Sequence, residues 1–206
     1  MLPAVTLLTH AETTAPADWI VAALRTFGAS VTSIVPEGFA AYARILHPAS
    51  DGGRLISWRE VAAANGTQVH AAMQFAALTR AAGWYPNEQP AVYGRPPLTG
   101  ELPEELVATV VSCLRPWTST PETCWFASWE GWGRLRPYVA LAPAFKVPQR
   151  RYHLLTGPIE AAAESLSEPP FTNTASLWWP DDRAWCVATE VDLDSTHVGC
   201  SRACLD

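Results

Sequence analysis

The sequence predicts an α+β fold, in which a helical N-terminal half packs on a mixed, mainly antiparallel sheet formed by the C-terminal half. Apolar residues recur at helical spacing as far as Arg115, and beyond Pro121 the spacing shortens to the two-residue period of strands. Helices followed by mixed strands indicate an α+β domain. The 206 residues suit one domain of ordinary size, so 1–206 is expected to fold as a single unit.

The first third of the chain is expected to form helix, strand and helix in that order. Residues 18–27 carry apolar side chains at helical spacing and are followed by Gly28. Residues 31–35 predict a short strand. Pro36 suits the first position of a second helix. The apolar face of that helix would hold Phe39, Tyr42, Ile45 and Leu46.

Three further helices and one long loop are expected before the sheet. Ser57 and Glu60 have the spacing of a capping box, which predicts a helix start. Residues 67–82 predict another helix. The stretch 83–100 is rich in Pro and Gly and predicts a long loop, either a binding loop or a structural wrap. The clearest helix covers 103–115, with one apolar stripe and acidic residues in its first turn.

The C-terminal half predicts three strands, over 123–130, 151–156 and 184–193, with a helix over 159–166 between the last two. The strand 184–193 alternates most regularly, and its apolar face predicts a core position for Trp185. In the first strand, Trp125 and Trp129 would share one face.

Composition narrows the classes of function. The net charge is −6 and the isoelectric point is near 5.3, which argues against nucleic-acid binding, and the longest basic cluster is only residues 149–151. The acidic balance leaves room for a basic protein partner. No apolar run reaches the length of a membrane span, and no basic leader precedes the N-terminal apolar patch. Five cysteines without disulfide spacing suggest a reduced, cytoplasmic protein.

Tryptophan is the most unusual component of the chain. Seven of the ten tryptophans fall between Trp117 and Trp185. They form either an aromatic core or a recognition surface, because tryptophan often anchors binding interfaces. The candidate binding residues, aromatic at the centre and acidic at the rim, are Trp132, Trp178, Trp179, Asp181 and Asp182.

An alternative site uses carboxylates. Glu190, Asp192 and Asp194 would share one face of the strand 184–193, where they could hold a hard cation or transfer protons. Together with His153 or Glu130 they would suit a metal-dependent hydrolase. A solvated strand face is the simpler explanation of the same pattern.

A cysteine- and histidine-based metal site is a weaker possibility. His197, Cys200 and Cys204 are spaced like ligands on a turn, and Cys186 could be a fourth. A structural zinc site usually needs two paired motifs, and only one pair is present. No metal and no cofactor are therefore expected, and no phosphate loop or nucleophile motif was found.

Two resemblances can be drawn. Residues 35–46, with Pro36, Phe39 and Tyr42, lead into Gly52-Gly53 and resemble the opening of SUKH-type immunity proteins. The Trp-rich blocks 124–133 and 177–186 resemble those of a family of actinobacterial proteins of unknown function. The first resemblance implies binding to a toxin-like partner, and the second implies no activity.

These observations lead us to expect a non-enzymatic binding protein with an acidic, Trp-rich surface, of which an immunity protein is one kind. The alternatives are the metal-dependent hydrolase and a small-ligand pocket walled by tryptophans. The oligomeric state is left open.

Overall fold

The protein has a mixed α+β fold, and the computed structural model describes residues 6–26, 28, 30–79 and 92–205. Most of the predicted loop 83–100 and the end of the predicted helix 67–82 lie outside the described residues. The predictions for those segments are tested only where they overlap the described ranges.

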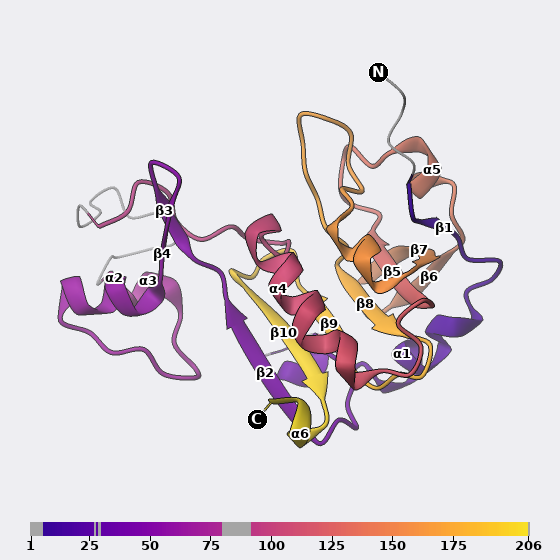
Figure 1. Ribbon diagram of the computed structural model, residues 1–206, viewed down its shortest axis with the longest axis horizontal. Helices are drawn as coiled ribbons and strands as arrows, with labels where there is room; N and C mark the ends of the chain where they lie inside the picture. Colours follow the sequence, from indigo (N-terminus) through magenta and orange to yellow (C-terminus); the bar gives the residue numbers. More distant parts are fainter. Residues whose placement is uncertain (1–5, 27, 29, 80–91, 206) are drawn as a thin grey trace.

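An eight-stranded antiparallel sheet forms the body of the protein (Figure 1). Its strands follow the order β1-β7-β5-β8-β9-β10-β2, and β6 also pairs with β7. The strands are β1 (Thr9–His10), β2 (Ala41–Leu46), β5 (Cys124–Trp129), β6 (Ala144–Val147), β7 (Arg150–Gly157), β8 (Leu177–Pro180), β9 (Cys186–Thr189) and β10 (Ser195–Cys200).

Both faces of the sheet are covered. Helix α4 (Glu104–Leu114) packs on one face through Val107, Val110 and Leu114. Helix α1 (Asp18–Ala23) packs on the other face through Ile20. Figure 1 shows α4 crossing in front of the sheet, with α1 behind it. The remaining short helical segments are η1 (Ala15–Ala17), η2 (Val31–Ser33), η3 (Arg115–Trp117), α5 (Pro137–Ala140), η4 (Ile159–Ala163) and α6 (Arg202–Leu205).

A small lobe projects from the end of the sheet (Figure 1). It contains the hairpin of β3 (Ala49–Asp51) and β4 (Arg54–Ile56), followed by α2 (Trp58–Asn65) and α3 (Phe75–Leu78). The lobe has its own apolar cluster, which includes Ile56, Val61, Phe75 and Leu78. The described residues thus bury apolar side chains in three places, two on the sheet and one in the lobe.

Several predicted elements are confirmed. Helix α4 has the bounds and the buried stripe expected for 103–115. The Ser57 side chain accepts from the Glu60 amide and the Glu60 carboxylate accepts from the Ser57 amide, so the capping box is present. Strands β5 and β7 match the predicted strands 123–130 and 151–156.

Other expectations were wrong, and long-range pairing explains the largest. The helix expected after Pro36 is the strand β2, because Ala41–Leu46 pairs along its whole length with β10. The strand expected over 184–193 ends at Thr189, and residues 190–194 turn the chain back into β10. The N-terminal half is therefore less helical than predicted.

Three shorter elements also differ. Residues 31–33 form the 3-10 turn η2 in place of a strand, and the Ser30 side chain accepts from the Thr32 amide at its start. The predicted helix 159–166 is the 3-10 segment η4, which begins after Pro158. Within the described part of 67–82, only Phe75–Leu78 is α-helical. None of the described helices has the length and apolar character needed to traverse a lipid bilayer.

Candidate functional site

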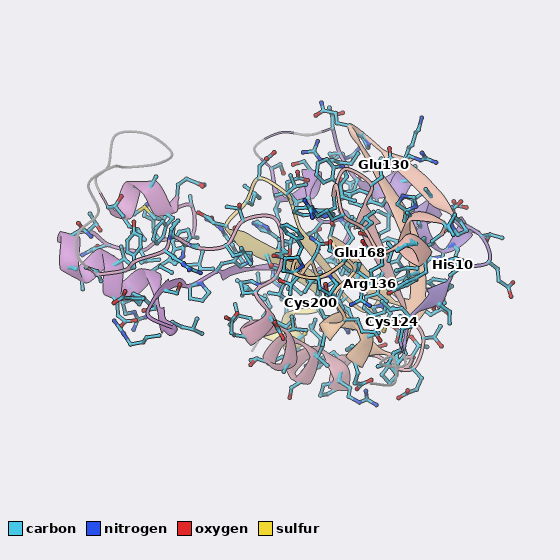
Figure 2. All side chains as sticks on the ribbon, turned by 90° about the horizontal axis from the view of Figure 1, so that it is seen from above. His10, Cys124, Glu130, Arg136, Glu168 and Cys200 are labelled. Atoms are coloured by element: carbon cyan, nitrogen blue, oxygen red, sulfur yellow. The ribbon has the colours of Figure 1, made fainter. Side chains whose placement is uncertain are left out.

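A cleft of about 790 Å³ lies where the small lobe meets the sheet body. The body contributes Leu46 at the end of β2, Pro48 just after it, and Leu106 of α4. The lobe contributes Leu55, Trp58 and Val69 among others. Figure 2, seen from above, shows the lobe standing apart from the body, joined to it only at one end. This volume is within the range of ligand-binding clefts.

Trp58 fixes the floor of the cleft. The capping box starts α2 at this residue, and the indole points back toward the body. Its Nε1 donates to the His47 carbonyl at 2.7 Å, and its ring packs edge-on against Phe75 at 5.3 Å between ring centroids. The side chain is buried. Trp58 therefore belongs to the apolar core of the lobe and also helps to attach the lobe to the body.

Arg44 makes the second connection between lobe and body. Its guanidinium donates to Ser195 Oγ at 2.9 Å and to the Met73 carbonyl at 2.7 Å. Its Cζ lies 5.4 Å from the centroid of the Trp58 ring, a cation–π contact. Asp194 lies 3.5 Å away and supplies the opposite charge. Burial lowers the pKa of Arg44, and Asp194 opposes this change.

His47 makes the third connection and is fully buried. Its Nδ1 is 2.7 Å from the Leu98 carbonyl, and its Nε2 is 2.9 Å from Thr196 Oγ1. Thr196 continues the chain of hydrogen bonds to Thr189 Oγ1 at 2.7 Å. Burial lowers the pKa of His47. Because a carbonyl oxygen only accepts, Nδ1 donates to Leu98. The three connections make the junction a fixed base for the cleft.

The cleft combines apolar walls with polar lining residues, of which Arg59 and Glu60 are charged. Leu55 and Val69 remain 43% and 37% exposed, which is high for large apolar side chains. On the lobe side, Glu60 pairs with Arg54 at 2.8 Å. On the body side, Leu106 follows two exposed carboxylates in the first turn of α4, those of Glu104 and Glu105. Neither has an ion-pair partner among the described residues.

The aromatic anchors proposed from the sequence are mostly buried. Trp178 and Trp179 are only 2% and 1% exposed, so their expected place on a surface was wrong. They point to opposite faces of β8, and both are covered because each face of the sheet carries a layer. Trp132 is half-buried and packs edge-on against Trp129, with ring centroids 5.7 Å apart. Trp185 is fully buried, as predicted.

The acidic rim residues proposed beside them support the fold. Asp181 Oδ1 accepts from Trp125 Nε1 at 3.0 Å. Asp182 accepts from the amide and hydroxyl of Ser119 and from the amide of Ala184. Partial burial opposes ionisation of Asp182, but these hydrogen bonds outweigh it and lower the pKa. Both carboxylates are exposed, but neither projects freely to solvent as an anchor would.

The carboxylates of the hydrolase hypothesis do not converge. Glu190 and Asp192 lie 2.6 and 3.5 Å from Arg150, whereas Asp194 pairs with Arg44 at the lobe junction. They do not share a strand face, because residues 190–194 form the turn between β9 and β10. The hollow beside the Arg150–Glu190 pair measures about 20 Å³, room for about one water molecule.

The other two residues of that hypothesis lie apart from these carboxylates. His153 Nδ1 contacts the Ala142 carbonyl at 3.1 Å, and Glu130 pairs with Arg151 at 2.9 Å. Figure 2 shows Glu130 at the border of the body, far from the lobe.

Of the thiol and imidazole ligands considered for zinc, Cys200 and Cys204 contact one another through their side chains, but Cys186 and His197 are not grouped with them. Cys186 and Cys200 belong to the apolar clusters on opposite faces of the sheet. His197 Nδ1 is buried and without a hydrogen-bond partner among the described residues, and burial lowers its pKa to about 4. Over the described ranges, no three His, Cys, Asp or Glu side chains are grouped so as to hold a metal ion.

Two features of the site were not identified from the sequence. The cleft is one, although the capping box at Ser57 and the apolar Leu55 and Val69 around it were visible. The other is Glu101, which precedes α4 and accepts from the Thr174 amide at 3.2 Å. Burial raises the pKa of Glu101 to about 7. Comparison with models of protein families, with curated proteins and with solved structures finds no match, so the ligand has to be inferred from the chain's own residues.

Proposed function

We propose that this chain is a non-enzymatic binding protein, and that the cleft between lobe and body receives an apolar group of a basic protein partner. The observation that carries the proposal is the cleft itself, with its apolar walls, its exposed Leu55 and Val69, and a base fixed by Trp58, Arg44 and His47. When the walls of a cleft are already ordered, binding costs little conformational entropy there.

The charge of the partner follows from the rim and from the whole chain. Glu104 and Glu105 directly precede Leu106, the α4 residue that lines the cleft, and the chain carries a net charge of −6. Complementary charge speeds encounter and disfavours acidic competitors. The proposed partner is therefore still a basic protein, as expected from the sequence. The proposed contact surface is the cleft, in place of the Trp178–Asp182 region.

Selection from a random library of twelve-residue peptides tests this proposal on residues 1–206. We expect enriched peptides with one large apolar residue next to Lys or Arg. Their affinity should fall at least tenfold for the double variant Leu55→Asn, Val69→Asn, because buried apolar contacts dominate such interfaces. Leu141→Asn is the matched control, since Leu141 is 78% exposed at the end of α5 (Pro137–Ala140) and does not line the cleft. Equal loss in the control, or no enrichment, would refute the proposal.

The charge contribution is tested separately. Glu104→Gln with Glu105→Gln should weaken peptide binding and reduce its dependence on salt, because two carboxylates would no longer attract the basic residues. Glu168→Gln, at an exposed position of the body, should leave both unchanged. An unchanged salt dependence in the double variant would show that the rim does not recognise charge.

A further inference from the structure

Strand β2 is the last strand of the sheet, and its outer side is not paired by any strand among the described residues. All six of its residues are partly exposed. Edge strands of this length are usually shielded by charges, proline or a covering segment, because their open backbone attracts other strands. Its sequence, Ala-Tyr-Ala-Arg-Ile-Leu, contains one charged residue and no proline.

The pairing with β10 identifies which backbone groups face outward. The His47 amide donates to the Asp194 carbonyl at 3.1 Å, so residue 47 faces β10. Because antiparallel pairs alternate, Ile45, Ala43 and Ala41 also face β10. The amides and carbonyls of Tyr42, Arg44 and Leu46 therefore point away from the sheet. Within the described ranges, none of these six groups has a hydrogen-bond partner.

The spacing of these groups fits one kind of ligand. Three outward residues, each two positions apart, repeat at roughly 6.5–7 Å. An extended polypeptide backbone presents donors and acceptors at the same repeat and can pair with all of them. Small molecules and nucleic acids do not offer this alternation.

The open edge leads directly into the cleft. Leu46, the last residue of β2, lines the cleft together with Leu106, which reaches it from the face of the sheet covered by α4. A peptide that follows β2 to its end would therefore bring a side chain to the cleft. Glu104 and Glu105 precede Leu106 in the first turn of α4, and a basic side chain of the peptide that reached this turn would be favoured there.

A second copy of this chain is the less suitable occupant of the edge. Two copies each carrying a net charge of −6 would repel one another. They would also bring two acidic α4 ends to the same junction. A basic peptide meets the same backbone groups and gains from the rim carboxylates.

We propose that the partner binds as an extended strand added to the outer edge of β2, with one apolar side chain in the cleft and a basic residue against Glu104 and Glu105. This inference rests on the proposed function and specifies how the partner binds. Backbone pairing would supply much of the affinity, and the cleft and rim would supply the selectivity.

Residue-resolved amide exchange on residues 1–206 is the test, with the tightest peptide from the library as the probe. The amides of Tyr42, Arg44 and Leu46 should exchange at least tenfold more slowly when the peptide is bound. Ala43 and Ile45 are internal controls, because their amides already face β10. N-methylation of the peptide at alternate residues should weaken binding about tenfold in one register and leave it nearly unchanged in the other, since only one set of amides would pair.

The outcomes separate the two proposals. If the peptide binds and depends on Leu55 and Val69, but the three outward amides exchange as before, strand addition is refuted and cleft binding stands. If no peptide is selected, both proposals fail. If the three amides are protected without peptide, in a manner that depends on protein concentration, the edge is occupied by a second copy and the peptide proposal is overturned.

Discussion

Replacing Glu101 with glutamine is expected to stabilise the protein at pH 8 and to change its stability little at pH 4. Burial raises the pKa of this carboxyl to about 7 from an ordinary value of 4.5. Between those values the folded state holds a proton that the unfolded state has released, so the free energy of unfolding falls as the pH rises. Glutamine stays neutral and can still accept from the Thr174 amide.

The magnitude follows from the width of that window. A separation of about 2.5 pH units at about 1.4 kcal/mol per unit gives an upper limit of about 3.5 kcal/mol at pH 8. Partial access of solvent to Glu101 reduces this, so a gain of about 1–3 kcal/mol is expected.

Urea unfolding at one-unit steps from pH 4 to pH 8 measures the effect in Glu101→Gln and in the wild type. Glu168→Gln, at an exposed position, is the control and should follow the wild type at every pH. A difference between Glu101→Gln and the wild type that is constant with pH would refute the reasoning. It would mean that the substitution acts through packing and not through the proton.

Three further predictions follow from other contacts. Burial lowers the pKa of His197 to about 4, so on acidification the unfolded state takes up a proton before the folded state does, and the free energy of unfolding falls. His197→Gln should therefore reduce this fall between pH 6.5 and about 4 in urea unfolding. Equal pH slopes in the variant and the wild type would contradict this. Trp58→Phe should cost about 1–3 kcal/mol in urea unfolding, since the His47 carbonyl loses its indole donor, whereas a cost near zero would mean that the hydrogen bond does not hold the lobe. Millimolar Mg²⁺ or Mn²⁺ should leave the melting temperature unchanged, because Glu190 and Asp192 are already paired with Arg150; a clear rise would restore the hydrolase hypothesis.

The parts of the fold that could be predicted are those set by nearby residues. The stripe of α4 and the capping box of α2 depend on side chains within a few positions of one another, and both were found. Strand β2 depends on β10, about 150 residues later, and its apolar residues also fit a helix. The alternation of Tyr42 and Leu46 with Ala43 and Ile45 was present, but only the pairing partner decides between the two periods.

The candidate site was harder to predict because it is made by the junction of two segments. The sequence drew attention to Trp178 and Trp179, since clustered tryptophans suit a binding surface. A sheet with both faces covered instead buries adjacent tryptophans on opposite sides. The cleft forms because Leu106 lies close to Leu46 and Val69 in the folded protein. These residues are far apart in the sequence, so no local spacing predicts their proximity.

The hydrogen bond between His47 and the Leu98 carbonyl has a consequence for the engineering of this chain. His47 directly follows β2, where the chain leaves the sheet, and Leu98 lies on the segment that returns to the body. The His47 Nδ1 atom is 2.7 Å from the Leu98 carbonyl oxygen. The lobe therefore leaves and rejoins the body at neighbouring positions, and it can be treated as one insertion. A short glycine linker from His47 to Leu98 should leave the eight-stranded sheet folded, because all of its strands lie outside residues 48–97.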